Sequence, residues 1–95
     1  MRITDVLWQE AVIDKLATKH HLTVDEVEEV LLLEPVVRRV ARGHVKGEDV
    51  YAALAQTASG RYVVIFFIGK KQGVALPISG RDMEREERAY YARHR

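Results

Sequence analysis

The sequence of 95 residues contains no cysteine, which excludes both a disulfide framework and a cysteine-based zinc site. It also lacks any apolar run near the ~20 residues that a transmembrane helix needs. Its longest apolar run extends only from Tyr62 to Gly69. The segment from Met1 to Asp5 has neither the basic start nor the apolar stretch of a secretory signal. These absences predict a soluble cytoplasmic protein with no membrane contact.

The common signatures of metal and nucleotide chemistry are absent too. His20 and His21 are adjacent, and successive helical residues do not share a face, while His44 and His94 lie far away in the sequence. The glycine-containing segment at residues 43–47 does not have the spacing of a phosphate-binding P-loop. We therefore expect no metal ion and no nucleotide cofactor.

Charge is divided unevenly along the chain. Residues 1–35 carry three Lys or Arg against eight Asp or Glu, a net charge of −5, whereas residues 36–95 carry twelve against six, a net charge of +6. Phosphate contacts supply most non-specific affinity for nucleic acid, so a basic half is the minimum that such binding requires. A solvated surface of uneven charge is the alternative, and composition leaves both open.

Hydrophobic periodicity predicts one α+β domain of order (β)ααββββα, with an antiparallel meander packed by helices. Thr23 and Glu26 form a capping box for the second helix, and Pro35 ends that helix. The expected elements are a short strand within residues 2–7, helices at 9–19 and 24–34, strands at 36–40, 50–57, 61–68 and 74–79, and a helix at 82–94.

Three details of this prediction concern exposure. The segment at residues 61–68 is apolar on both faces, which is typical of a central strand. Pro77 has no N–H to donate, so its strand is expected at an edge or with that position free. Residues 43–47 and 69–73 are expected to be hairpin loops, and the acidic run at residues 25–29 is expected to face water.

The C-terminal segment holds the most informative residues. A strand ending at residues 78–80 delivers Arg81, and Arg88 and Tyr91 follow on one side of the expected helix. Metal-independent RNA cleavage needs a base, an acid and cations that stabilise the charge of the phosphorane. Arginine supplies the cation through bidentate contacts, and tyrosine or histidine can transfer the proton.

Two glutamates accompany this cluster. Glu84 precedes Arg88 by four residues and Glu87 precedes Tyr91 by four, so each is expected to orient its neighbour. The alternative is an amphipathic helix in which Met83 packs while the charges pair and stay in water. Composition alone favours this amphipathic helix over an RNA-cleaving cluster.

Taken in order, these residues resemble BrnT-type toxins over nearly the whole chain. The resemblance in the first half rests on Trp8-Gln9-Glu10, Lys15, Lys19-His20 and the capped segment Thr23-Val24-Asp25-Glu26-Val27. In the second half it rests on Gly60-Arg61-Tyr62, Ile78-Ser79-Gly80-Arg81, Glu87-Arg88 and Tyr91.

The resemblance implies a RelE-like fold and a ribonuclease toxin of a type II toxin–antitoxin pair, which cleaves RNA without a metal and inhibits translation. It implies RNA and a cognate antitoxin protein as partners, with a homodimer or a toxin–antitoxin hetero-oligomer as the assembly. Glu87 also matches the family pattern. The implied catalytic residues are His20, Arg81, Arg88 and Tyr91, and the implied RNA-binding residues are Lys19, Arg61, Arg81 and Arg88.

The chain departs from the family pattern at three places. Residues 75–77 lack the arginine that members usually carry there, Gly80 replaces an alanine, and Asp82 places an acid beside Arg81. Fewer free cations weaken phosphate binding. The alternative functions are therefore a catalytically weak or inactive binding or regulatory module of the same fold, and an interaction domain that binds a partner through the acidic second helix.

Overall fold

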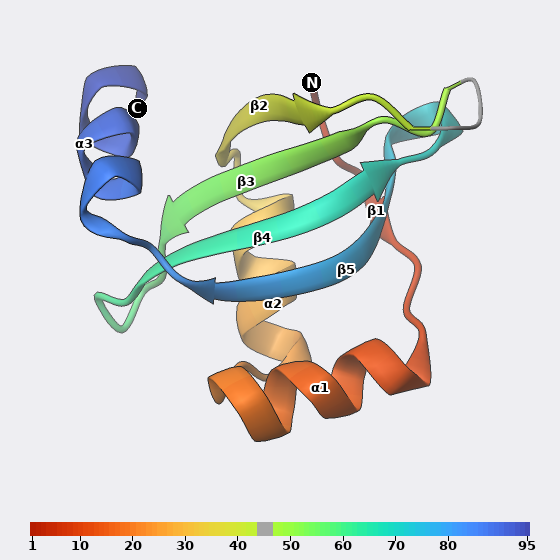
Figure 1. Cartoon of the computed structure of the whole chain (residues 1–95), viewed down its shortest axis with the longest axis horizontal. Helices are drawn as coiled ribbons and strands as arrows, with labels where there is room; N and C mark the ends of the chain where they lie inside the picture. The colour runs from red at the N-terminus through yellow and green to blue at the C-terminus, as the bar shows by residue number, and fades with distance from the viewer. Residues whose placement is uncertain (44–46) are drawn as a thin grey trace.

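The computed structural model describes residues 1–43 and 47–95, and within these residues it contains a five-stranded sheet and three α-helices (Figure 1). None of the helices in these ranges is both long and apolar enough to cross a bilayer. The elements are β1 (Asp5–Val6), α1 (Glu10–His20), α2 (Val24–Leu32), β2 (Val36–Ala41), β3 (Val50–Gln56), β4 (Tyr62–Gly69), the 3-10 turn η1 (Lys71–Gly73), β5 (Val74–Asp82) and α3 (Arg85–His94).

The predicted α+β class and element order are confirmed. The strands are ordered β1-β5-β4-β3-β2, and β2 to β5 form the expected antiparallel meander. β1 pairs in parallel with β5, through Asp5 with Val74 and Val6 with Ala75, so the sheet is mixed. Most of the loop predicted at residues 43–47 lies outside the described residues, which do not include 44–46.

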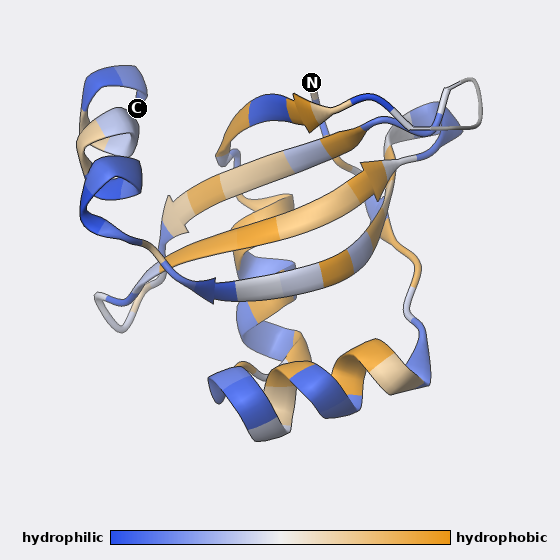
Figure 2. Ribbon diagram, in the orientation of Figure 1, coloured by the Kyte–Doolittle hydropathy of each residue, from blue (hydrophilic) through white to orange (hydrophobic). Residues whose placement is uncertain are grey.

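The strand β4 is central, as its sequence predicts, because β5 and β3 flank it. It is hydrophobic along its length (Figure 2). Val63, Ile65 and Phe67 are fully buried in the core between the sheet and the helices α1 and α2, while Val64 and Phe66 belong to a second apolar cluster on the opposite face. Each face of β4 therefore has its own hydrophobic cover.

The edge position expected for Pro77 is also confirmed. β1 pairs with β5 only at Val74 and Ala75, so the rest of β5, including Pro77, has only β4 as a neighbouring strand. The Lys15 ammonium donates a hydrogen bond of 2.7 Å to the carbonyl oxygen of Ile78 at this free edge. A side chain of α1 thus satisfies part of the edge that no strand covers.

The helix α2 begins with the predicted capping box. The Thr23 hydroxyl accepts a hydrogen bond from the Glu26 N–H, and the Glu26 carboxylate accepts one from the Thr23 N–H, each at 3.1 Å. The helix ends at Leu32, and Pro35 follows before β2 begins.

The acidic side of α2 does not simply face water, so that expectation was wrong for most of it. Glu26 lies 3.5 Å from the Arg61 guanidinium. Glu28 accepts a hydrogen bond of 2.8 Å from the indole N–H of Trp8, and Glu29 accepts one of 2.5 Å from the Ala58 N–H. These half-buried carboxylates hold α2 to the chain around it, which leaves fewer of them for a partner.

The helix α3 begins later than predicted. Asp82 still belongs to β5, and α3 starts at Arg85 because Glu84 and Glu87 form a capping box at its N-terminus. The helix is mostly hydrophilic and has no buried residue. In Figure 1 it stands at one end of the sheet, away from α1 and α2. Most of that sheet face therefore carries no helix.

Gly80 marks a tight point in the core. A Cβ at this position would lie 2.7 Å from Ile65 Cδ1 and 3.3 Å from Leu22 Cδ1. We expect Gly80→Ala to lower the free energy of unfolding by about 1 kcal/mol in urea denaturation, because the buried Ile65 must leave its rotamer. Ile65→Val removes the Cδ1 atom that a Cβ at residue 80 would meet. The double variant Ile65→Val/Gly80→Ala is therefore expected to be no less stable than Ile65→Val alone. Additive losses would contradict this explanation.

Candidate functional site

A cavity of about 240 Å³ lies between the second sheet face and α3. Its floor is apolar and comes from β3 and β4, while its rim carries charged and aromatic side chains from β2 and α3. We call this cavity the α3 groove, and it is lined by Arg38, Val40, Ala52, Leu54, Val64, Phe66, Glu86, Glu87 and Tyr90.

Arg81 is located next to the groove, near the carboxyl end of β5, as the sequence predicts. Its guanidinium donates two hydrogen bonds to the Glu87 carboxylate, at 2.7 and 2.9 Å, and lies 3.4 Å from the Glu84 carboxylate. It also lies 5.3 Å from the centre of the Phe66 ring. The bidentate geometry is the one that arginine uses for carboxylates and phosphates alike.

The carboxylate of Glu87 therefore occupies a position that an anionic ligand would use. Burial alone would raise the pKa of Glu87, but the hydrogen bonds from Arg81 and the Glu84 N–H, with the charges of Arg81 and Arg38, hold that pKa below its ordinary value. The expectation that Glu84 and Glu87 orient Arg88 and Tyr91 was wrong. Both carboxylates turn toward Arg81 instead.

Arg88 and Tyr91 meet at Tyr62, the first residue of β4. The Arg88 guanidinium lies 4.1 Å from the centre of the Tyr62 ring, and the Tyr91 ring packs edge-on against the same ring at 6.2 Å. The Tyr91 hydroxyl accepts a hydrogen bond of 3.4 Å from the Gln56 N–H. Arg88 and Tyr91 thus lie together, on the same side of the sheet as Arg81.

Sequence reasoning missed Arg38, Phe66 and Tyr90 as site residues. The Arg38 guanidinium lies 4.8 Å from the centre of the Tyr90 ring, which stacks on the His94 ring at 4.0 Å. A signal for Arg38 was present, because it occupies the same face of its strand as Val36 and Val40. Edge strands often carry charged side chains, so this signal alone did not single out Arg38.

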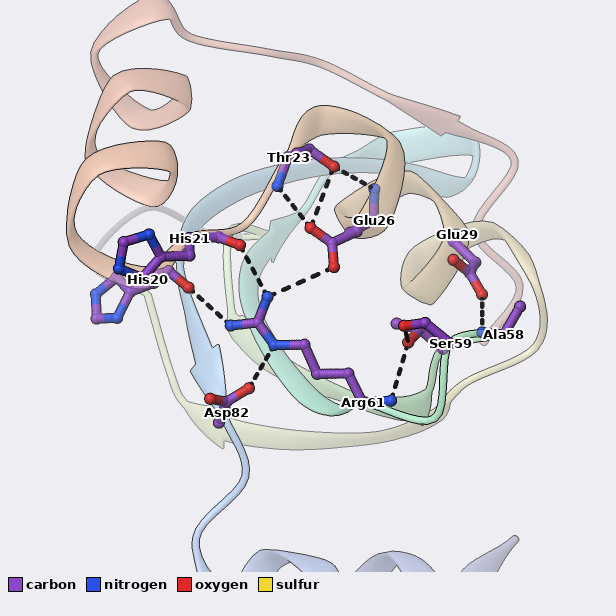
Figure 3. Close-up of polar contacts among 10 residues, drawn as sticks. His20, His21, Thr23, Glu26, Glu29, Ala58, Ser59, Arg61 and Asp82 are labelled. Atoms are coloured by element: carbon purple, nitrogen blue, oxygen red, sulfur yellow. Dashed lines mark hydrogen bonds and ion pairs between the residues drawn. The ribbon is translucent and has the colours of Figure 1, made fainter.

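Arg61 lies on the opposite face of the sheet, within a network of internal contacts (Figure 3). Its Nε donates to Asp82 at 2.6 Å, and its two terminal nitrogens donate to the carbonyl oxygens of His21 and His20 at 2.8 and 2.7 Å. The Glu26 carboxylate adds a contact of 3.5 Å. Arg61 thereby satisfies carbonyl groups that the end of α1 leaves without helical partners.

The predicted site residues are therefore divided between two faces of the sheet. Arg81, Arg88 and Tyr91 lie on the face of the α3 groove, whereas Arg61 reaches across the other face to the carboxyl end of α1, which also carries the exposed Lys19. His20 offers Arg61 its carbonyl oxygen, and its imidazole points away from that guanidinium (Figure 3).

The groove and its surroundings combine guanidinium groups with aromatic rings. Arginines there can contact phosphates, and aromatic rings can stack on bases. Within residues 1–43 and 47–95, no three His, Asp or Glu side chains gather closely enough to hold a metal ion.

Comparison with known proteins adds no relative. No protein-family model matches the sequence, and no curated protein matches it either.

Proposed function

We propose that this protein is a RelE-like, BrnT-type ribonuclease toxin that acts on RNA through the α3 groove. One observation carries the proposal. Three guanidinium groups on one sheet face each lie over an aromatic ring, at 4.8, 5.3 and 4.1 Å from the ring centres. The three pairs are Arg38 with Tyr90, Arg81 with Phe66 and Arg88 with Tyr62.

These pairs suit the two components of single-stranded RNA. Bases stack on aromatic rings, and phosphates bind guanidinium groups. A row of alternating arginine and aromatic side chains can therefore bind an RNA strand without a metal ion. The α+β order and the antiparallel meander are compatible with a RelE-like fold. In this proposal the groove binds the strand, and Arg81 and Arg88 contact the phosphodiester that is cleaved.

In the cleavage step the ribose 2′-hydroxyl gives its proton to a solvent water and attacks the neighbouring phosphorus. A 2′,3′-cyclic phosphate forms as the bond from phosphorus to the 5′-oxygen breaks. Arg81 and Arg88 stabilise the additional negative charge on the phosphorane. Tyr91 donates a proton to the leaving oxygen, because its hydroxyl accepts from the Gln56 N–H and keeps its own proton for donation. His20 lies across the sheet from this group, so the proposal assigns proton transfer to Tyr91, with Lys19 and Arg61 as more distant cations.

A second candidate is an RNA-binding module of the same fold that cleaves weakly or not at all. The bidentate contact between Arg81 and Glu87 favours it, since a phosphate must displace an internal carboxylate before it reaches the guanidinium. Either candidate pairs with an antitoxin, and an acidic antitoxin segment would bind the same arginines. The assembly is then a toxin–antitoxin hetero-oligomer or a homodimer.

Growth of cells that express this protein tests the proposal that it is a toxin. We expect expression without an antitoxin to arrest growth and the purified protein to cleave RNA in the presence of a chelator. Arg81→Ala is expected to lower the cleavage rate by about 100-fold, because one stabilising donor of the transition state is lost, and to relieve the arrest.

Arg39→Ala is the matched control, because it removes an exposed arginine of β2 that pairs with Asp49 at 3.3 Å. It is expected to preserve both the arrest and the cleavage. RNA that is bound but stays intact, with no arrest, would favour the binding module over the toxin. Absence of both RNA binding and arrest would exclude both candidates.

A further inference from the structure

Two charged side chains on the rim of the α3 groove are available for a ligand. Among the residues that the structure describes, neither the Glu86 carboxylate nor the Arg38 guanidinium has a hydrogen-bond or ion-pair partner. The Arg38 guanidinium lies over the Tyr90 ring, and its charge acts on the nearby Glu87 carboxylate. Glu87, beside them, is occupied by Arg81. The groove therefore offers one free carboxylate and one free guanidinium fork.

The space between these groups suits a flat, uncharged ring. Ala52, Leu54 and Val64 form a buried apolar floor, and the Phe66 and Tyr90 rings also line the groove. A volume of about 240 Å³ is below the ~300–1,000 Å³ of drug-sized pockets, and it matches one nucleobase better than a whole nucleotide.

Guanine is the base whose edges match both charged groups. Its O6 and N7 are two acceptors side by side, the pair that arginine contacts most often in base recognition. Its N1–H and N2 amino group are two donors side by side, which a carboxylate accepts in bidentate fashion. Adenine places an amino donor next to N7, uracil has a single ring N–H, and cytosine has a single amino group.

We propose that the α3 groove is a guanine-binding subsite, in which Arg38 donates to O6 and N7 and Glu86 accepts from N1–H and the N2 amino group. This inference rests on the proposed function and specifies its substrate as RNA with a guanosine at the site of action. Glu87 both lines the groove and contacts Arg81, so the phosphate next to the bound guanosine lies within reach of Arg81.

Binding of short RNA oligomers to the full chain tests the subsite. The probes are fluorescent uridine oligomers of about six nucleotides that carry one central guanine, adenine, cytosine, inosine or 7-deazaguanine. We expect the guanine oligomer to bind at least about tenfold more tightly than the adenine, cytosine and all-uridine oligomers, because a bidentate base contact discriminates by about 1–3 kcal/mol. Inosine lacks the N2 amino group and 7-deazaguanine lacks N7, so each is expected to lose about fivefold.

Variants assign the two edges of the base. Glu86→Gln is expected to remove the preference of guanine over inosine while it preserves that of guanine over 7-deazaguanine, and Arg38→Ala is expected to do the reverse. Glu10→Gln makes the same charge change at an exposed position of α1, across the sheet, and is expected to preserve both preferences. Glu86 is exposed on a helix with no buried residue, so its variant is expected to fold, which circular dichroism checks.

The outcomes separate this inference from the proposed function. Equal binding of all oligomers by the unmodified chain would overturn the guanine subsite and leave RNA binding intact. A Glu86→Gln variant that still prefers guanine over inosine would also overturn it. Failure to bind any oligomer would overturn both the subsite and the RNA-directed function.

Discussion

Replacing Arg61 with alanine is expected to lower the free energy of unfolding by about 3 kcal/mol. The guanidinium donates to Asp82, to the carbonyl oxygens of His20 and His21, and to Glu26. It joins the end of α1, the start of α2 and the end of β5 through one side chain. Its loss affects three elements at once.

The partners do not contribute equally to this loss. The Asp82 side chain is 66% exposed, so it returns to water at little cost despite its short contact, although it is the largest factor that raises the pKa of Arg61. The His20 carbonyl oxygen and the Glu26 carboxylate, which is 26% exposed, form part-buried contacts and are less able to do so. An unsatisfied buried polar group costs about 1–3 kcal/mol, and these groups account for most of the expected effect.

Urea denaturation followed by circular dichroism measures the effect. Arg61→Lys preserves the charge but loses the planar fork, so we expect it to recover less than half of the stability. Arg39→Ala removes an arginine whose side chain is 53% exposed and is expected to cost under about 1 kcal/mol. If Arg61→Ala is no more destabilising than Arg39→Ala, Arg61 does not hold these elements together.

Replacing Glu87 with glutamine is expected to raise the affinity for single-stranded RNA by about tenfold. The carboxylate of Glu87 binds both terminal nitrogens of Arg81 and competes with phosphate for them. Glutamine can still accept from the Glu84 N–H and cap α3, but it carries no negative charge. A phosphate then reaches Arg81 without displacing an anion.

Salt titrations of oligomer binding distinguish this explanation from a general gain of positive charge. The logarithm of the association constant is expected to fall more steeply with the logarithm of salt concentration in Glu87→Gln, by about one unit of slope, because one more phosphate is neutralised. The double variant Arg81→Ala/Glu87→Gln is expected to show no gain. A gain that persists without Arg81 would mean that Glu87 acts elsewhere in the groove.

Local signals in the sequence predicted most of the fold. The capping box of α2, the central position of β4 and the edge position of Pro77 all follow from short patterns, and all three are confirmed. The start of α3 was misplaced, since Asp82 still belongs to β5 and the structure caps the helix with Glu84. Capping by a glutamate is a weaker sequence signal than capping by an aspartate.

The site was harder to predict because its contacts join distant parts of the chain. Helical spacing placed Arg88 and Tyr91 together, and both do contact Tyr62. Helical spacing says nothing of Arg38, which reaches Tyr90 from another element. The division of the predicted residues between two sheet faces depends on strand register, which sequence alone does not set for Arg61 and Arg81.

The parallel pairing of β1 with β5 has a consequence for synthesis on the ribosome. The hydrogen bond from the Thr4 hydroxyl to the Gln72 carbonyl, beside this pairing, spans 68 residues, so the first strand to be made is the last to find its neighbour. A nascent chain that stops before Val74 lacks the partner of β1 and also the segment that carries Arg81. An unfinished copy therefore has neither a complete sheet nor the arginine beside the groove.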